Sequence, residues 1–126
     1  MKRAVATEDA PDAIGPYSQA IASGDLLFVS GQIALDAATG RLVADSVEIE
    51  TGQVLKNLGA ILAAAGVTLD AVVRTTIYLT DLGDFPRVNQ VYADFFAAPF
   101  PARATVGVAA LPRGARIEID AIARRS

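Results

Sequence analysis

One segment of this chain repeats its apolar residues at helical spacing more clearly than any other. Between residues 45 and 65, leucine, isoleucine and valine recur every three or four positions, which predicts an amphipathic α-helix. Asp45, with Glu48 three residues later, fits the capping box that begins such helices. Gly66 stands where helices commonly end. The fold therefore includes a long helix that buries one face against another element.

The segments on both sides of this helix are rich in β-branched and aromatic residues. Strands are predicted at 17–22, 26–30, 71–80, 102–109 and 115–123, with room for another short strand at the start. A turn at 23–25 joins the first two into a hairpin, which Gly31 is predicted to end. A second helix follows Asp84, which can cap it, with Pro86 tolerated in its first turn. The order β-β-α-β-α-β-β predicts an α+β fold with both helices on one face of a mixed or mostly antiparallel sheet.

Length and apolar content indicate one domain covering residues 1–126. The chain has 126 residues, of which 52% are hydrophobic, and this is enough for a core of its own. The sheet face away from the helices carries both polar and apolar residues. Such a mixed face points to an oligomer, in which another copy covers it.

The residue types that are absent restrict the chemistry more than those that are present. The sequence contains no cysteine and no histidine. It therefore has no thiol nucleophile, no imidazole base and no Ser-His-Asp triad. No metal-ligand spacing and no glycine-rich phosphate loop occurs either. Any catalysis has to use carboxylates, arginines, hydroxyls, amides and the backbone.

The charge balance argues against nucleic acid as a partner. Eleven basic and fourteen acidic residues give a formal net charge of −3, whereas nucleic-acid binding usually needs a basic face. The N-terminal residues turn acidic before an apolar segment develops, so no signal peptide is predicted. The apolar stretches are too short for a membrane span, and a cytoplasmic location is expected.

Four charged or polar residues in the last two strands are candidates for a site. Alternation places Arg103 and Thr105 on one face of their strand, and Glu118 and Asp120 on one face of the next. If the helices cover the opposite, apolar faces, all four residues project onto one outer surface. Arg103 could there bind a small carboxylate, and Glu118 could move protons. The pattern alone fits a solvent-exposed cross-strand ion pair of Arg103 with Glu118 even better.

Further polar residues lie at element ends, and each has a structural as well as a functional reading. Tyr17 could form a pocket wall, Ser30 and Gly31 could approach a ligand at a strand end, and Asn89 could bond a ligand from the second helix. On the pattern alone, packing, a strand terminus and a solvated helix face explain these residues better.

The chain as a whole resembles the RidA (YjgF) family over nearly its whole length. The most diagnostic pieces are FPARATV at 100–106 and IEIDAIA at 117–123. Other matching blocks lie at 6–11, 14–20, 29–33, 53–58 and 80–85, together with Leu111-Pro112, Asn89, Tyr92 and Phe95-Phe96. The order and spacing of these blocks make the resemblance specific, although each block alone is weak.

The resemblance implies a chorismate-mutase-like fold that assembles as a homotrimer with active sites in clefts between subunits. It also implies hydrolysis of reactive enamines and imines, such as 2-aminoacrylate and 2-iminopropanoate, to 2-keto acids and ammonia. No cofactor and no metal would be used. The substrates would come from pyridoxal-phosphate dehydratases that act on serine or threonine.

By position, the resemblance gives two residues a catalytic role. Arg103 would hold the substrate carboxylate, and Glu118 would activate the water or shuttle its proton. The cleft would be lined by Tyr17, Ser30, Gly31 and Asn89, with Thr105 beside the reacting imine. Two positions depart from the family: Thr105 stands where many members carry cysteine, and Ala34 where a proline is common.

Three other functions remain open on the sequence. The chain could deaminate a different imine or enamine, such as 2-aminomuconate. It could carry the endoribonuclease or translation-inhibitor activity for which relatives are often labelled, although the acidic charge and lack of histidine argue against this. It could also bind small carboxylates without turnover.

Overall fold

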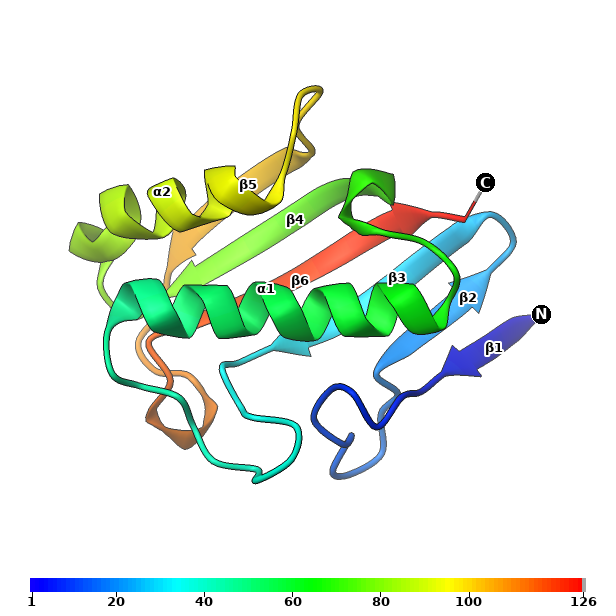
Figure 1. The fold of residues 1–126 in the computed structure, drawn as a ribbon, viewed down its shortest axis with the longest axis horizontal. Coiled ribbons are helices and arrows are strands. Elements are labelled where there is room, and N and C mark those ends of the chain that lie inside the picture. Colours follow the sequence, from blue (N-terminus) through cyan, green and yellow to red (C-terminus); the bar gives the residue numbers. More distant parts are fainter. Residues whose placement is uncertain (126) are drawn as a thin grey trace.

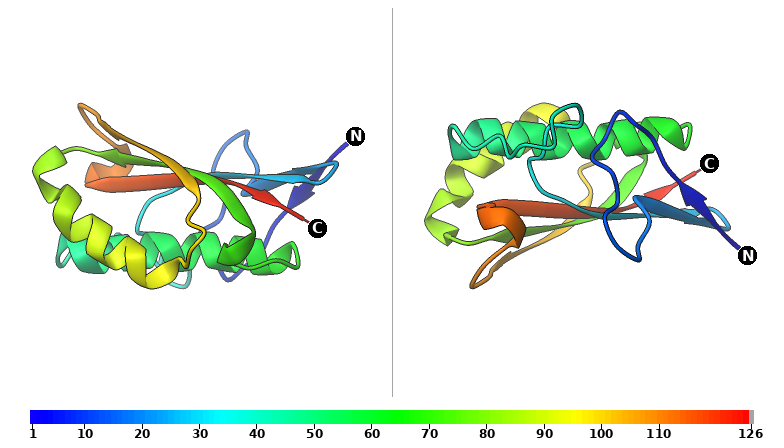
Figure 2. Two further views of the ribbon diagram at one scale, coloured as in Figure 1. Left: turned by 90° about the horizontal axis from the view of Figure 1, so that it is seen from above. Right: turned by 90° about the horizontal axis from the view of Figure 1, so that it is seen from below.

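Six strands form one sheet, in the order β1-β2-β3-β6-β4-β5, in a computed structural model that describes residues 1–125. Figure 1 shows the sheet with both helices in front of it, and Figure 2 shows that they lie on the same face. The elements are β1 (Lys2–Val5), β2 (Ala20–Ser23), β3 (Leu26–Gln32), α1 (Val47–Ala64), β4 (Val72–Leu79), α2 (Phe85–Phe95), β5 (Ala102–Gly107) and β6 (Ile117–Arg124). The predicted α+β class, the added N-terminal strand and the placement of both helices on one face are confirmed.

The sheet is mixed because of its last strand pair. β1, β2, β3, β6 and β4 pair antiparallel in that spatial order, whereas β5 pairs parallel with β4. A parallel pair needs a crossover connection, and α2 supplies it between β4 and β5. The predicted hairpin of β2 and β3 is present, with Gly24 in the left-handed region at its turn (φ 58°).

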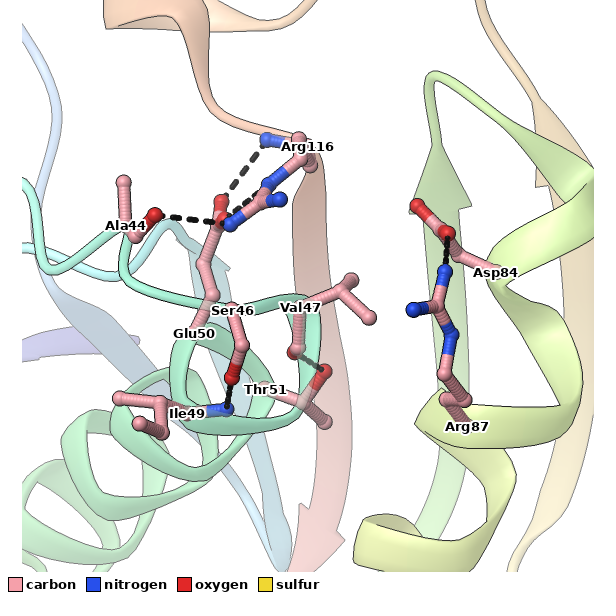
Figure 3. Close-up of polar contacts among 9 residues, drawn as sticks. All are labelled: Ala44, Ser46, Val47, Ile49, Glu50, Thr51, Asp84, Arg87 and Arg116. Carbon is pink, nitrogen blue, oxygen red and sulfur yellow. Dashed lines mark hydrogen bonds and ion pairs between the residues drawn. The ribbon is translucent and has the colours of Figure 1, made fainter.

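α1 packs its apolar stripe on the sheet, and its N-cap lies one residue later than predicted. Ser46, and not Asp45, is the N-cap: its backbone is extended, and its hydroxyl accepts a hydrogen bond from the Ile49 amide at 3.1 Å (Figure 3). The prediction that Asp45 is the cap is wrong, because Ser46 is the residue before the helix that has the extended backbone of an N-cap. The helix ends as predicted: Gly66 has φ 84°, and its amide donates to the Ala63 carbonyl at 2.9 Å.

Two further local predictions are corrected. Gly31 does not end β3, which continues to Gln32 after a register irregularity against β6. Such a bulge redirects a strand without terminating it. Asp84 occupies the N-cap position of α2, but its carboxylate makes no capping bond because it pairs with Arg87 instead (Figure 3). Pro86 lies in the first turn of α2 as predicted.

The core lies between the helices and the sheet. The side chains that fill it are completely or almost completely buried; the largest are Leu27, Leu55, Leu58, Ile61, Leu62, Ile77, Leu79, Ile117 and Ile119. Within residues 1–125, no helix combines the length and hydropathy that a bilayer span requires. The opposite face of the sheet is covered by no helix (Figure 2).

Candidate active site

Arg103 and Thr105 lie on the helix side of the sheet. Arg103 is paired in register with Thr75, and Thr105 with Ile77. Residues paired in register point to the same face of a sheet, and Thr75 and Ile77 are completely buried beneath the helices. Direct contacts of Arg103 with α2 agree with this placement.

Glu118 and Asp120 lie on the opposite, uncovered face. They pair in register with Tyr78 and Thr76, which alternate with the buried residues of β4. The prediction that Arg103, Thr105, Glu118 and Asp120 share one outer surface is therefore wrong. A cross-strand ion pair between Arg103 and Glu118 is excluded for the same reason.

The physical cause of this error lies in β5. The prediction assumed that its small apolar residues face the helices, but Val106 is 40% exposed on the uncovered face. Because both faces of the sheet carry apolar residues, alternation separates the two faces of a strand without telling which one meets the core.

The guanidinium of Arg103 is held on the helix side by three residues of α2. Its Nη1 donates to Oδ1 of Asn89 at 2.8 Å, and its Cζ lies 5.1 Å and 4.9 Å from the ring centroids of Phe85 and Tyr92. No carboxylate among residues 1–125 lies within ion-pair distance of it. The side chain borders a cavity of about 420 Å³ lined by Asn89, Tyr92, Ala93, Phe100, Pro101 and Arg103. This arrangement can bind an anion that comes from outside the chain.

Glu118 lies in a second cavity, of about 350 Å³, that Tyr17 and Gly31 also line. Gly31 leaves room for the Glu118 carboxylate in its present position, since a Cβ on Gly31 would lie 2.8 Å from Cδ of Glu118 and closer still to Oε2. Burial, followed by the negative charge of Asp120, raises the pKa of Glu118. A carboxyl group with a raised pKa in a cavity holds a proton more readily than an exposed one and is suited to accept and return a proton.

Asp120 is itself held by Tyr78 on the uncovered face. The Tyr78 hydroxyl donates to Oδ2 of Asp120 at 2.9 Å, and this bond is the main reason that the pKa of Tyr78 is raised. The pair therefore keeps a negative charge close to Glu118.

A buried ion pair fixes the chain just before Glu118. Glu50 of α1 is completely buried and accepts from the backbone amide and from Nε of Arg116, both at 2.8 Å (Figure 3). Arg116 also donates to the Ala44 carbonyl at 2.9 Å. These bonds join the entry of β6 to the first turn of α1.

The predicted site residues thus separate into two groups. Tyr17, Gly31 and Glu118 line one cavity, and Asn89 and Arg103 line the other. Ser30 lies next to the first group, where its hydroxyl donates to the Ser18 carbonyl at 2.5 Å. Thr105 is half-buried on the helix side, two residues beyond Arg103, and lines neither of these cavities.

Sequence reasoning missed the aromatic residues around Arg103. Phe85 and Tyr92 stand four residues before and three residues after Asn89, and this spacing places all three on one face of a helix. Helical periodicity in the segment 85–95 is the signal that could have grouped them. In the part of the chain that the structure describes, no group of three or more acidic, histidine or cysteine residues is placed to hold a metal ion.

Comparisons with known proteins agree on one family. The family model described as endoribonuclease L-PSP matches residues 7–125. Reactive Intermediate Deaminase A, chloroplastic, of Arabidopsis thaliana is 56% identical over 122 residues, which cover 97% of this chain and 65% of that protein. The 2-iminobutanoate/2-iminopropanoate deaminase of Homo sapiens is 50% identical over 123 residues, covering 98% of this chain and 90% of that protein.

A solved structure gives the same result for the fold. The crystal structure of E. coli TdcF with bound serine superposes with a TM-score of 0.94 at 42% identity, covering 98% of this chain and 99% of that one. The family match spans almost the whole chain, and the sequence identities are high over the same length. The chain therefore belongs to the endoribonuclease L-PSP family, which is the YjgF/RidA family that its motifs resemble.

Proposed function

We propose that this protein hydrolyses small 2-imino and 2-enamino acids, of the 2-iminopropanoate and 2-aminoacrylate type, to 2-keto acids and ammonia. The observation that carries the proposal is the Arg103 guanidinium, which is ordered by α2, borders a cavity and has no carboxylate partner among residues 1–125. Relatives about 50% identical to this chain are named for this reaction, and TdcF binds serine, another small carboxylate.

The reaction needs a clamp, a water molecule and a proton relay. Arg103 would hold the substrate carboxylate in a bidentate contact and fix the position of the imine carbon. Glu118 would accept a proton from water as the water oxygen bonds to that carbon. The same proton would then pass to the nitrogen and give a carbinolamine, an enamine substrate reacting as its imine tautomer. Glu118 would next move the proton of the new hydroxyl group to the nitrogen, and the C–N bond would break to release ammonia and leave the 2-keto acid. The imine carbon is already electrophilic, so no stronger nucleophile is needed.

The two cavities can serve one substrate only if they come from different copies of the chain. Arg103 and Glu118 lie on opposite faces of one sheet. The uncovered face also carries exposed apolar side chains: Phe28 is 43% exposed and Val106 is 40% exposed. We therefore include in the proposal a homotrimer whose inter-subunit clefts combine Arg103 and Asn89 of one subunit with Tyr17, Gly31 and Glu118 of the next.

The proposal assigns the remaining residues smaller roles. Ser30 would shape the cleft by holding the loop before it, and Thr105 would pack near the imine in place of a family cysteine. The reaction would use no cofactor and would take place in the cytoplasm, on products of pyridoxal-phosphate dehydratases. Which imine is the physiological one would depend on the residues at the cleft entrance.

A coupled assay tests the proposal. A pyridoxal-phosphate dehydratase generates 2-aminoacrylate from serine, and the release of pyruvate is followed with wild type, Arg103→Ala and Glu118→Gln. We expect acceleration by wild type and its loss in both variants. No acceleration by a folded, oligomeric wild type, or full activity of Arg103→Ala, would exclude this function. RNA incubated with the same preparations tests the endoribonuclease label of the family, and we expect no cleavage from a protein of net charge −3.

A further inference from the structure

Tyr92 is the most deeply placed residue of the Arg103 cavity. Only 4% of it is exposed, yet its ring lies against the guanidinium, with 4.9 Å between Cζ of Arg103 and the ring centroid. This distance is within the range of a cation–π interaction. Phe85 lies at a similar distance, but Tyr92 is the more deeply buried of the two.

The ring of Tyr92 is anchored on two further sides. Its hydroxyl forms a hydrogen bond with Oγ1 of Thr75 at 2.8 Å, and Thr75 is completely buried on β4. The ring also stacks on Phe96, with 4.4 Å between the centroids. Breaking the hydroxyl bond would leave a buried polar group unpaired, so the ring is held firmly in one place.

An arginine loses much rotamer freedom when it is ordered. A side chain that is ordered before its ligand arrives has less freedom left to lose on binding, and the affinity is higher as a result. Asn89 holds one N–H of Arg103, and the anchored ring of Tyr92 limits where the guanidinium can lie.

We propose that Tyr92 is a positioning residue for Arg103. Its ring, anchored through Thr75 to the sheet, holds the guanidinium in place for the carboxylate of the substrate. This inference rests on the proposed function, since it takes Arg103 to be the carboxylate clamp. Tyr92 itself acts through Arg103.

The test distinguishes the effect of removing the Tyr92 ring from the effect of a less stable α2. In the coupled assay, Tyr92→Leu should raise KM about two- to fivefold, as expected from the loss of one exposed-site cation–π interaction, and leave kcat nearly unchanged. Tyr92→Phe keeps the ring and its stacking on Phe96 and loses only the bond to Thr75, so its KM should lie between those of wild type and Tyr92→Leu.

Val88→Ala is the matched control. Val88 is completely buried on the same helix, so its truncation destabilises α2 without removing a ring from Arg103. We expect a lower melting temperature with an unchanged KM. A KM for Tyr92→Leu equal to that of wild type, or an equal rise in Val88→Ala, would overturn the positioning role.

If the proposed function is wrong, the result would differ from the one expected when only the positioning role of Tyr92 is wrong. In that case wild type itself would show no turnover, and the positioning role would be read from pyruvate binding, followed by NMR titration. Weaker pyruvate binding by Tyr92→Leu than by Tyr92→Phe would support the inference. Equal binding by the two variants would overturn it.

Discussion

Glu118 is harder to ionise than an ordinary glutamate because it is partly buried and because Asp120 lies on the same face of the sheet. Burial in the cavity is the larger cause of its raised pKa, and the charge of Asp120 is the smaller one. Asp120 is fixed by the hydroxyl of Tyr78, and Tyr17 and Arg113 line the same cavity as Glu118. A change in the charge of Asp120 should therefore change the pKa of Glu118.

The surroundings of Glu118 predict how kcat/KM depends on pH. The proposed mechanism needs ionised Glu118 to accept the proton of water, so kcat/KM should rise with pH as Glu118 loses its proton. Asp120→Asn removes a negative charge, favours the ionised form and lowers the pKa of Glu118, so the acid limb of the profile should move to lower pH. Tyr78→Phe keeps the charge of Asp120 and should not produce this downward move. An acid limb that stays in place in Asp120→Asn would mean that another group titrates.

Gly31 offers a second prediction at the scale of single residues. A Cβ added there would meet the carboxylate of Glu118, which ends a flexible side chain and can move aside. Gly31→Ala should therefore lower kcat strongly, by about tenfold or more, with little loss of stability. Gly52→Ala is the control: Gly52 lies in α1 with no atom within 4 Å of the added Cβ, and this change should raise stability by about 0.5–1 kcal/mol at unchanged activity. Full activity of Gly31→Ala would contradict the proposed role of Glu118.

The residue types of the candidate site could be predicted from the sequence, but the face of the sheet to which each side chain points could not. Arg103 and Glu118 were recognisable as candidates, and each does border a cavity. That they point to opposite faces could not be deduced, because Ala104 and Val106 are apolar and yet lie on the uncovered face. The side that a β5 residue faces is decided by where the helices pack, which is a property of the whole fold.

At the scale of elements, the start of α1 distinguishes two adjacent capping candidates. The hydroxyl of Ser46 accepts from the Ile49 amide, whereas Asp45 is exposed one residue before the cap. Ser46→Ala should lower the free energy of unfolding by about 1 kcal/mol, and Asp45→Ala by no more than about 0.5 kcal/mol. Urea denaturation of both variants measures the difference. A larger loss in Asp45→Ala would show that Asp45 is the cap.

The existence and order of the elements could be predicted because each depends on local signals. Helical periodicity and Gly66 fixed the span of α1 to within two residues, and the β-branched runs located the strands. The exact cap, the bulge after Val29 and the pairing of Asp84 with Arg87 depend on contacts that form only in the folded chain. The parallel pairing of β5 with β4 likewise depends on the path of α2.

At the scale of the whole molecule, the proposed homotrimer would account both for the uncovered sheet face and for the separation of Arg103 from Glu118. A second copy that covers this face would bury the exposed apolar residues and bring a Glu118 cavity to an Arg103 cavity. In a closed ring of three copies, each cleft takes Arg103 from one subunit and Glu118 from the next. The two groups could then be inactivated on different subunits.

Mixing two inactive variants tests this directly. Arg103→Ala and Glu118→Gln subunits, co-expressed in equal amounts with different tags, should form hybrid trimers in which one cleft of three keeps both groups. Random assembly gives about three-quarters hybrids, so the mixture should recover about a quarter of the wild-type activity. Purification through both tags should raise this to about a third, because only hybrids remain. Mixing the separately assembled variants without subunit exchange should recover nothing. If the doubly tagged hybrids are inactive, Arg103 and Glu118 do not share a cleft across the subunit boundary, and the division of the site between copies is wrong.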